Sequence, residues 1–364
     1  MKYINIYLST TPEERGDKPP RYLINYKNLI KEYEEYKKEL EEIAEIIKNT
    51  NYIESETGLP VYSIAIFYNV SNKELKIKGF PFKLPNKIVV SRNPYDKYLN
   101  YLESEFGNNL IVSYSKKEFK SYIISSNKFQ AISEDLDYIK PHFESGVYRT
   151  SMREGRQVLR TIGGQNIDSV INEEEKRLSR YIADRIEEIV SKFQIDRLFI
   201  SSPDEKSKNI VSDYLSKRTK GIFKGFISLN NSSKNELLNK LLEKLSEIDI
   251  EEEKGVFEEF REKAGYNLAV VGLENVIKHA LMHNIRTLII NPNFSHEGYV
   301  CHSNGVFYHK ELDFPCDDIE KVKDIVDYIV DAVIESQGKI EVAHTQELNE
   351  LIAYQVGAIL RFKV

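Results

Sequence analysis

The clearest indication of the fold lies in residues 163–201, which read GGQNIDSVINEEEKRLSRYIADRIEEIVSKFQIDRLFIS. Two adjacent glycines and a glutamine precede a stretch whose large apolar residues recur every three or four positions. That spacing predicts a helix with one buried face from about Asp168 to Phe193, and Asp168 or Ser169 can cap its first turn. The run Arg197 to Ser201 then has the length and apolar content of a buried strand.

Strand and helix patterns also alternate on both sides of this stretch. Polar breaks near residues 104–108 and 230–236 divide the chain of 364 residues, which is longer than one hydrophobic core usually supports. We therefore predict an α/β and α+β protein with three domains, each with its own sheet flanked by helices. The predicted domains are residues 1–103, residues 104–230 with the glycine-bearing loop, and residues 231–364.

Several elements are predicted from local patterns. Apolar and aromatic residues from Tyr22 to Ile47 alternate steps of four and three, which predicts one long helix packed on its own domain's sheet, with a coiled-coil partner as the alternative. Residues 134–166 show little apolar periodicity and are expected to form a loop, whereas residues 319–336 are expected to form a helix. The strands predicted for the first domain are Met1 to Leu8, Ser63 to Tyr68, Leu75 to Phe80 and Lys87 to Val90.

The composition is that of a globular protein, with 41% hydrophobic and 30% charged residues. No stretch approaches the roughly 18 consecutive apolar residues that a membrane span needs, and the first residues lack the apolar core of a signal peptide. We therefore expect a cytoplasmic location and no membrane partner. The net charge of −6 means that any binding of nucleic acid must depend on local basic patches.

Gly163, Gly164 and Gln165 are the candidate catalytic residues. Two adjacent glycines allow backbone conformations and close approaches that other residues do not, and Gln165 adds a side-chain amide with donors and acceptors. Such a tip could enter a narrow RNA cavity, order a water molecule against an ester carbonyl and donate an N–H to the developing oxyanion. The alternative is an ordinary turn in front of a helix.

Cations surround this tripeptide in the sequence. The candidate RNA-binding residues are Arg149, Arg153, Arg156, Arg160, Lys176, Arg177 and Arg180. Guanidinium and ammonium groups in this number could hold tRNA phosphates. Acidic residues such as Glu173, Asp184 and Glu187 share the helix, so a mixed solvated surface is the alternative interpretation.

Three landmarks in order resemble the archaeo-eukaryotic class 1 release factors. Gly163-Gly164-Gln165 before a long helix resembles their central domain. The segment Val270 to Val276 resembles the start of their third domain, and Val356 to Phe362 is similar to its Gly-Ile-Gly-Ala-Ile-Leu-Arg-Tyr ending. The N-terminal part better resembles bacterial members of the superfamily, through residues 5–9 and 63–67.

This resemblance implies ribosome-dependent hydrolysis of the peptidyl-tRNA ester, in rescue or another non-standard release. The implied partners are the ribosome, peptidyl-tRNA and rRNA, with a translational GTPase as a further candidate. The Asn-Ile-Lys-Ser and Tyr-x-Cys-x-x-x-Phe motifs of stop-codon readers are absent, so codon-specific reading is not expected. A non-catalytic ribosome- or RNA-binding regulator, in the manner of the Pelota relatives that lack the tripeptide, stays open, as does a protein-interaction scaffold.

No cofactor or metal is expected. The chain has two cysteines, Cys301 and Cys316, and thus no disulfide framework. Some relatives hold a zinc knuckle at this place, but structural zinc requires four close ligands, so we expect free thiols here and keep zinc as the alternative. His279 and His283 have the i, i+4 spacing of metal ligands on a helix, and we expect a surface pair without metal.

Overall fold

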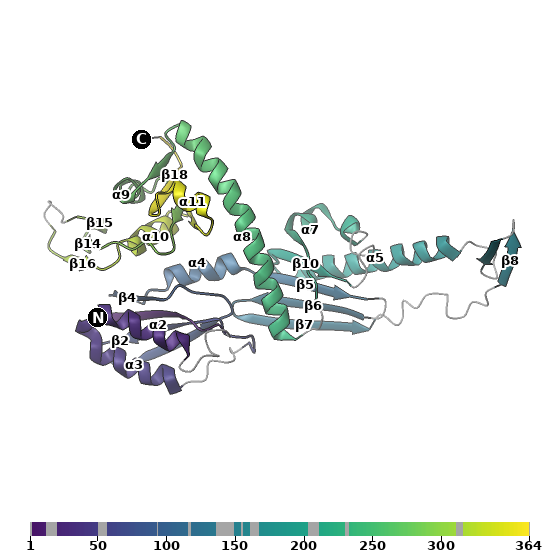
Figure 1. The fold of residues 1–364 in the computed structure, drawn as a ribbon, viewed down its shortest axis with the longest axis horizontal. Coiled ribbons are helices and arrows are strands. Elements are labelled where there is room, and N and C mark those ends of the chain that lie inside the picture. Colours follow the sequence, from purple (N-terminus) through teal and green to yellow (C-terminus); the bar gives the residue numbers. More distant parts are fainter. Residues whose placement is uncertain are drawn as a thin grey trace. The chain divides into compact units, whose positions relative to one another are not determined.

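A computed structural model describes residues 2–11, 20–49, 57–92, 94–115, 118–135, 149–153, 156–160, 167–202, 211–229, 233–310 and 316–363. The fold is mixed α/β, with several separate sheets flanked by helices, which confirms the predicted fold class (Figure 1). Contacts between residues group the chain into two units. The first unit holds residues 1–53, 61–104 and 242–364, and the second holds residues 54–60 and 105–241. The predicted three-domain boundaries stay a prediction.

The first unit begins with a four-stranded antiparallel sheet in the order β3-β2-β1-β4. Side chains alternate between its two faces, so Ile4, Ile6 and Leu8 of β1 lie in the core beneath helices α2 and α3. This alternation explains why the sequence predicted these strands well. Their bounds are β1 Tyr3–Ser9, β2 Ser63–Asn69, β3 Leu75–Phe80 and β4 Lys87–Ser91.

The long helix predicted from Tyr22 to Ile47 is wrong in one respect, because the chain breaks between α2 (Arg21–Leu29) and α3 (Lys37–Asn49). Two short 3-10 turns separate the helices, and Tyr33 between them has non-helical dihedral angles. The Tyr33 hydroxyl donates to the carbonyl of Ile88 on β4 at 2.6 Å. The break therefore lets a buried tyrosine satisfy its hydroxyl on the sheet. Both helices still pack on this domain's own sheet, as expected.

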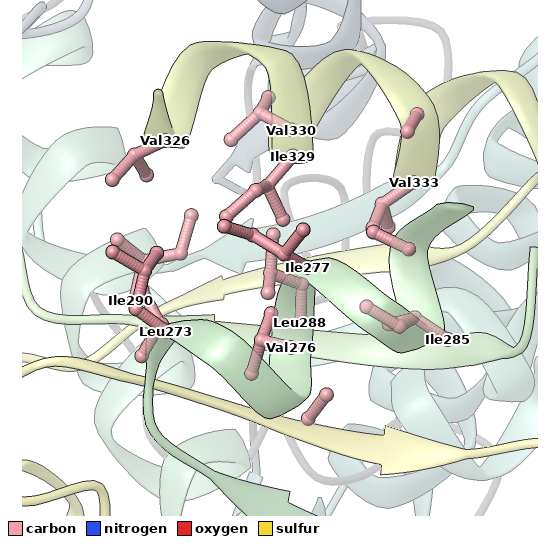
Figure 2. Packing of buried hydrophobic residues seen from close by; sticks show 14 of the residues in the cluster. Leu273, Val276, Ile277, Ile285, Leu288, Ile290, Val326, Ile329, Val330 and Val333 are labelled. Carbon is pink, nitrogen blue, oxygen red and sulfur yellow. The ribbon is translucent and has the colours of Figure 1, made fainter. Parts of the chain in front are cut away.

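The C-terminal part of the first unit has a second four-stranded sheet in the order β12-β18-β13-β17. Helices α9 and α10 cover it, and Figure 2 shows Ile329 and Val333 of α10 directed toward Ile277 of α9 and toward side chains of β13. This cluster is the largest apolar core of the chain's described part. The bounds are β12 Ala269–Val271, α9 Leu273–Leu281, β13 Ile285–Ile290, α10 Val326–Glu335, β17 Lys339–Val342, α11 Gln346–Leu351 and β18 Val356–Leu360.

The helix predicted for residues 319–336 is wrong over residues 319–325. Residues Ile319–Val322 form strand β16, which pairs with β14 (Gly298–Cys301), and the helix begins only at Val326. β15 (Val306–Tyr308) pairs with the other edge of β14 and completes a small three-stranded sheet. Pairing with a strand distant in sequence thus overrides the local helical pattern.

Polar contacts join the two parts of the first unit. Lys87 of β4 forms ion pairs with Asp324 at 2.7 Å and with Asp327 at 2.5 Å. Helix α4 (Lys97–Phe106) adds Tyr101, whose hydroxyl accepts from the amide of Ile340 at 2.9 Å. These contacts give partners to charged and polar groups that become buried where the two parts of the first unit meet.

The second unit is built on a mixed sheet in the order β11-β10-β5-β6-β7. β10 pairs in parallel with both β5 and β11, and the hairpins β5-β6 and β6-β7 are antiparallel. The bounds are β5 Asn109–Tyr114, β6 Glu118–Ser125, β7 Lys128–Asp135, β8 Arg149–Arg153, β9 Arg156–Arg160, α5 Ile167–Lys192, β10 Arg197–Ser201, α7 Lys217–Ile222 and β11 Phe223–Phe226. The long helix α8 (Lys234–Gly265) begins in this unit and continues into the first.

Candidate functional site

The loop expected for residues 134–166 contains a two-stranded antiparallel ribbon, β8-β9, so that expectation is wrong for residues 149–153 and 156–160. β9 ends at Arg160 and helix α5 begins at Ile167. The tripeptide Gly163-Gly164-Gln165 joins the ribbon to the helix and lies outside the described residues. The structure therefore describes the elements on either side of the tripeptide, β9 and α5.

The register of the ribbon brings the four predicted arginines together. Arg149 is paired with Arg160, and Arg153 is paired with Arg156. Directly paired residues occupy the same face of a ribbon, and so do residues four positions apart on one strand. All four arginine positions therefore share one face, with only Ser151 and Val158 between the two pairs.

Two pairs of like charges are unfavourable in a free ribbon. Directly opposed like charges destabilise an antiparallel pair, and two such pairs occur within five positions of each strand. An anion such as a phosphate would offset that repulsion and could accept paired hydrogen bonds from a guanidinium group. We call these four positions the arginine face.

The three predicted cations of α5 are exposed, namely Lys176, Arg177 and Arg180. Between them, Ser179 is buried and Leu178 packs against the core of the second unit. The guanidinium carbon of Arg180 lies 5.2 Å from the centre of the Tyr214 ring, so this cation is in contact with an aromatic face. Lys176 and Arg177 lie four and three residues before Arg180, nearer the start of the helix.

Contacts farther along α5 hold the helix in place, and the sequence did not reveal them. Glu187 accepts from the amide of Ser216 at 2.7 Å and from the hydroxyl of Thr219 at 2.7 Å, which ties α5 to the start of α7. Arg185 forms ion pairs with Glu134 of β7 and with Glu188. The hydrogen bond from Lys192 and the charge of Arg185 lower the pKa of Glu188.

The cysteine prediction is wrong. Cys301 and Cys316 form a disulfide, with 6.1 Å between their Cα atoms, instead of two free thiols. His302, a possible zinc ligand, contacts Glu320 at 2.7 Å. Across the described ranges, no group of three or more histidine, cysteine or acidic side chains could hold a metal ion. The pairing could not be read from the sequence, because two cysteines alone do not determine their separation in the fold.

The expected surface pair of histidines is also wrong. Helix α9 ends at Leu281, so His283 lies beyond it with a φ of 52°, and only His279 is helical. His279 is buried, and one of its ring nitrogens lies 3.2 Å from the side-chain amide of Asn284. Burial and the neighbouring charge of Lys278 lower the pKa of His279, which favours the neutral ring.

No family model and no curated protein matches this chain. Solved structures that resemble it include archaeal translation termination factor aRF1, with 12% identity, a TM-score of 0.25, and 99% of this chain and 92% of that chain covered. Pelota of Archaeoglobus fulgidus has 11% identity and a TM-score of 0.37, with 84% of this chain and 84% of that chain covered. Dom34 of S. cerevisiae has 14% identity and a TM-score of 0.37, with 89% of this chain and 91% of that chain covered. Dom34 is a translation termination-like factor involved in RNA quality control pathways and interacting with Hbs1.

These likenesses extend over most of each chain at low identity. None of the three scores carries an argument about function. The function proposed for this protein therefore depends on the residues of its own chain. Among the described residues, moreover, no helix is both long enough and apolar enough to cross a membrane.

Proposed function

We propose that this protein binds the ribosome and hydrolyses the ester of peptidyl-tRNA through Gly163-Gly164-Gln165, in rescue or another release that needs no stop codon. One observation carries this proposal: the arginine face ends in Arg160, directly before the segment that holds the tripeptide. A cationic platform next to a glycine-bearing tip suits a substrate that has phosphates beside a reactive ester.

In this proposal the two elements have separate tasks. The arginine face binds phosphates of the tRNA acceptor end and thereby positions the ester. The tripeptide orders one water molecule and donates a backbone N–H to the oxyanion that develops on the ester carbonyl. Water adds to the carbonyl carbon, the bond to the ribose oxygen breaks, and that oxygen takes up a proton. No residue of the protein forms a covalent bond to the peptide.

The ribosome, peptidyl-tRNA and rRNA are the proposed partners, in the cytoplasm, with a translational GTPase as a further candidate. Because the chain has a net charge of −6, attraction to RNA depends on local groups. The arginine face, together with Lys176, Arg177 and Arg180 of α5, supplies such a local surface.

A second candidate function is supported by the start of α5. The sequence from Asn166 to Glu175 carries four acidic residues, Asp168 and Glu173 to Glu175, with no cation, so the residues just after the tripeptide are acidic. Acidic residues repel RNA phosphates at the place where a hydrolytic tip would enter. This feature favours a ribosome-binding regulator without hydrolytic activity.

Purified ribosomes stalled with a labelled peptidyl-tRNA distinguish these functions. Two quantities are measured on the same sample: protein that sediments with the ribosomes, and labelled peptide that is released. A hydrolase gives both. Sedimentation without release in every stalled complex tested would reject the hydrolase and leave the regulator, and no sedimentation at all would reject both.

A further inference from the structure

The first sheet of the chain has an aromatic and basic second face. The face opposite α2 and α3 carries Tyr3 on β1, Phe67 and Asn69 on β2, and Lys76 and Lys78 on β3. In the register, Tyr3 lies opposite Asn69, and Phe67 lies opposite Lys76. Tyr3 and Phe67 are thus diagonal neighbours on adjacent strands, within reach of one flat ligand.

A cavity of about 370 Å³ lies over this face, beside the start of α4. Tyr3 and Phe67 line it together with Leu99 of α4, and its polar lining includes Asn69, Lys76 and Asp96. Pockets for small ligands usually measure about 300–1,000 Å³ and combine apolar walls with a few polar groups. The cavity therefore has the size and composition for one small planar molecule.

The Tyr3 ring of this floor is held by a hydrogen bond. The side-chain amide of Asn69 donates to the Tyr3 hydroxyl at 3.1 Å, while its carbonyl oxygen accepts from the amide of Ser71 at 2.9 Å. Asn69 is buried, whereas Tyr3 and Phe67 are partly exposed. Aromatic rings that are held in place and open to solvent suit stacking against a flat ligand.

The charged groups of the lining are two lysines of β3 and two carboxylates, Glu74 and Asp96. Lys78 is neutralised by Glu103, which lies 2.8 Å from its ammonium nitrogen, so Lys76 is the cation offered to a ligand from β3. Asp96 stands just before α4 and Glu74 just before β3. A fitting ligand is flat, carries one anionic group for Lys76, and donates hydrogen bonds to a carboxylate.

We infer that this cavity binds one unpaired nucleotide. The base stacks on Tyr3 and Phe67, its amino group donates to Asp96, and the phosphate binds Lys76. Adenine, guanine and cytosine carry an exocyclic amino group, and uracil does not. The nucleotide is either a free monophosphate or an unpaired residue of an RNA strand, which share this chemistry.

Calorimetric titration of the full chain tests the inference. The probes are the four ribonucleoside 5′-monophosphates and an unstructured RNA hexamer. We expect saturable binding of one ligand per chain, with UMP weakest among the monophosphates. Tighter binding of the hexamer than of any monophosphate identifies RNA as the source, and equal or weaker binding identifies the free nucleotide.

Two matched pairs of variants locate the site. Phe67→Leu keeps apolar bulk but removes the aromatic plane and should weaken binding by about tenfold, whereas Phe67→Tyr should not. Lys76→Ala should weaken binding and reduce its salt dependence, whereas Lys83→Ala, an exposed lysine outside the cavity lining, should have no effect. Circular dichroism checks that each variant folds, and Lys76→Ala decides the matter where Phe67→Leu does not fold.

Absence of saturable binding by all five probes would overturn the inference. Binding that survives both Phe67→Leu and Lys76→Ala would overturn it too. The titration uses no ribosomes, so its outcome is independent of whether the protein releases peptides.

Discussion

At the scale of single residues, the proposed function assigns phosphate binding to the four arginine positions of the ribbon. Arg149, Arg153, Arg156 and Arg160 share one face because their strands pair in a register that opposes arginine to arginine. Phosphate contacts of this kind are screened by salt and carry no sequence preference. The arginine face is therefore expected to govern affinity for the ribosome, while the tripeptide governs the chemistry.

Reversing two of these charges tests that division. Arg156→Glu combined with Arg160→Glu should weaken ribosome binding by about tenfold or more, and should flatten its dependence on salt. Arg218→Glu, an exposed arginine on α7, is the control with the same chemical change and should have little effect. Sedimentation with ribosomes at several salt concentrations gives both quantities. Equal losses for the double variant and the control would exclude a specific role for the ribbon.

Gln165 should contribute less to release than the glycine before it. Gln165→Ala keeps the backbone N–H and loses only the side-chain amide that orders water. We expect release to slow by about tenfold, which corresponds to about 1.4 kcal/mol, with ribosome binding unchanged, because the backbone N–H that faces the oxyanion remains. Single-turnover release with saturating protein measures this step. A larger loss for Gln165→Ala than for Gly164→Ala would assign the chemistry to the side chain.

At the scale of elements, local patterns predicted the strands β1 to β4, the strand β10 and the helix α5. Period-two alternation marks β1 to β4, and the recurrence of apolar residues every three or four positions marks α5. The failures come from contacts distant in sequence. Tyr33 interrupts a helix to reach Ile88, and residues 319–322 form a strand because β14 pairs with them. The ribbon β8-β9 was missed because its residues lack a run of apolar side chains.

Helix α8 contains one buried carboxylate, Glu253, next to the exposed Glu251 and Glu252. Glu253 is 1% exposed, and its two oxygens accept from the backbone amides of His344 and Thr345, each at 2.9 Å. These bonds satisfy two amides where β17 leads into α11. Nothing in the local sequence distinguishes Glu253 from its neighbours Glu251 and Glu252.

Glu253→Ala should lower the free energy of unfolding by about 2–4 kcal/mol, because two partly buried backbone amides lose a charged acceptor. Glu251→Ala is the matched control. It removes only an exposed i, i+3 ion pair with Lys254 and should cost about 0.5 kcal/mol or less. Calorimetry on the full chain measures both variants. A similar small effect for both would show that the buried bonds do not stabilise the helix junction.

At the scale of the whole molecule, the joint between the two parts of the first unit carries buried charge. Burial raises the pKa of Asp331 on α10 to about 7, against the attraction of Lys97 and with repulsion from Asp327, Glu335 and Asp96. One oxygen of Asp331 is buried without a hydrogen-bond partner. The folded state therefore binds a proton that the unfolded state releases at lower pH.

This linkage has a definite sign. An acid whose folded pKa is raised destabilises the fold as pH rises from its ordinary pKa toward 7, and the loss is complete above 7. Burial raises the pKa of Glu341 to about 7 as well, which acts in the same direction. We expect thermal stability of the first unit to fall between about pH 4 and 7, and Asp331→Asn to make that fall shallower by on the order of 2 kcal/mol. An unchanged pH dependence in Asp331→Asn would place the titration elsewhere.

The division of the chain into units could not be predicted from the sequence. The polar breaks near residues 104–108 and 230–236 separate sheets, but they do not reveal that residues 61–104 and 242–364 share one unit. Ion pairs such as Lys87 with Asp324 create that joint, and residues more than two hundred positions apart leave no local pattern. The sequence identified the four arginines of the ribbon but not the register that pairs them, and the role of the tripeptide stays a prediction.

In the proposed function, peptide release requires a backbone conformation at the tripeptide that glycine allows. The most direct test is single-turnover release from stalled ribosomes, with wild type and Gly164→Ala compared at equal ribosome occupancy. The added methyl group penalises positive φ and close approach but removes no charge, so release should slow by about a hundredfold or more while binding is retained. Full release activity in Gly164→Ala would contradict the account and remove the tripeptide as its active element.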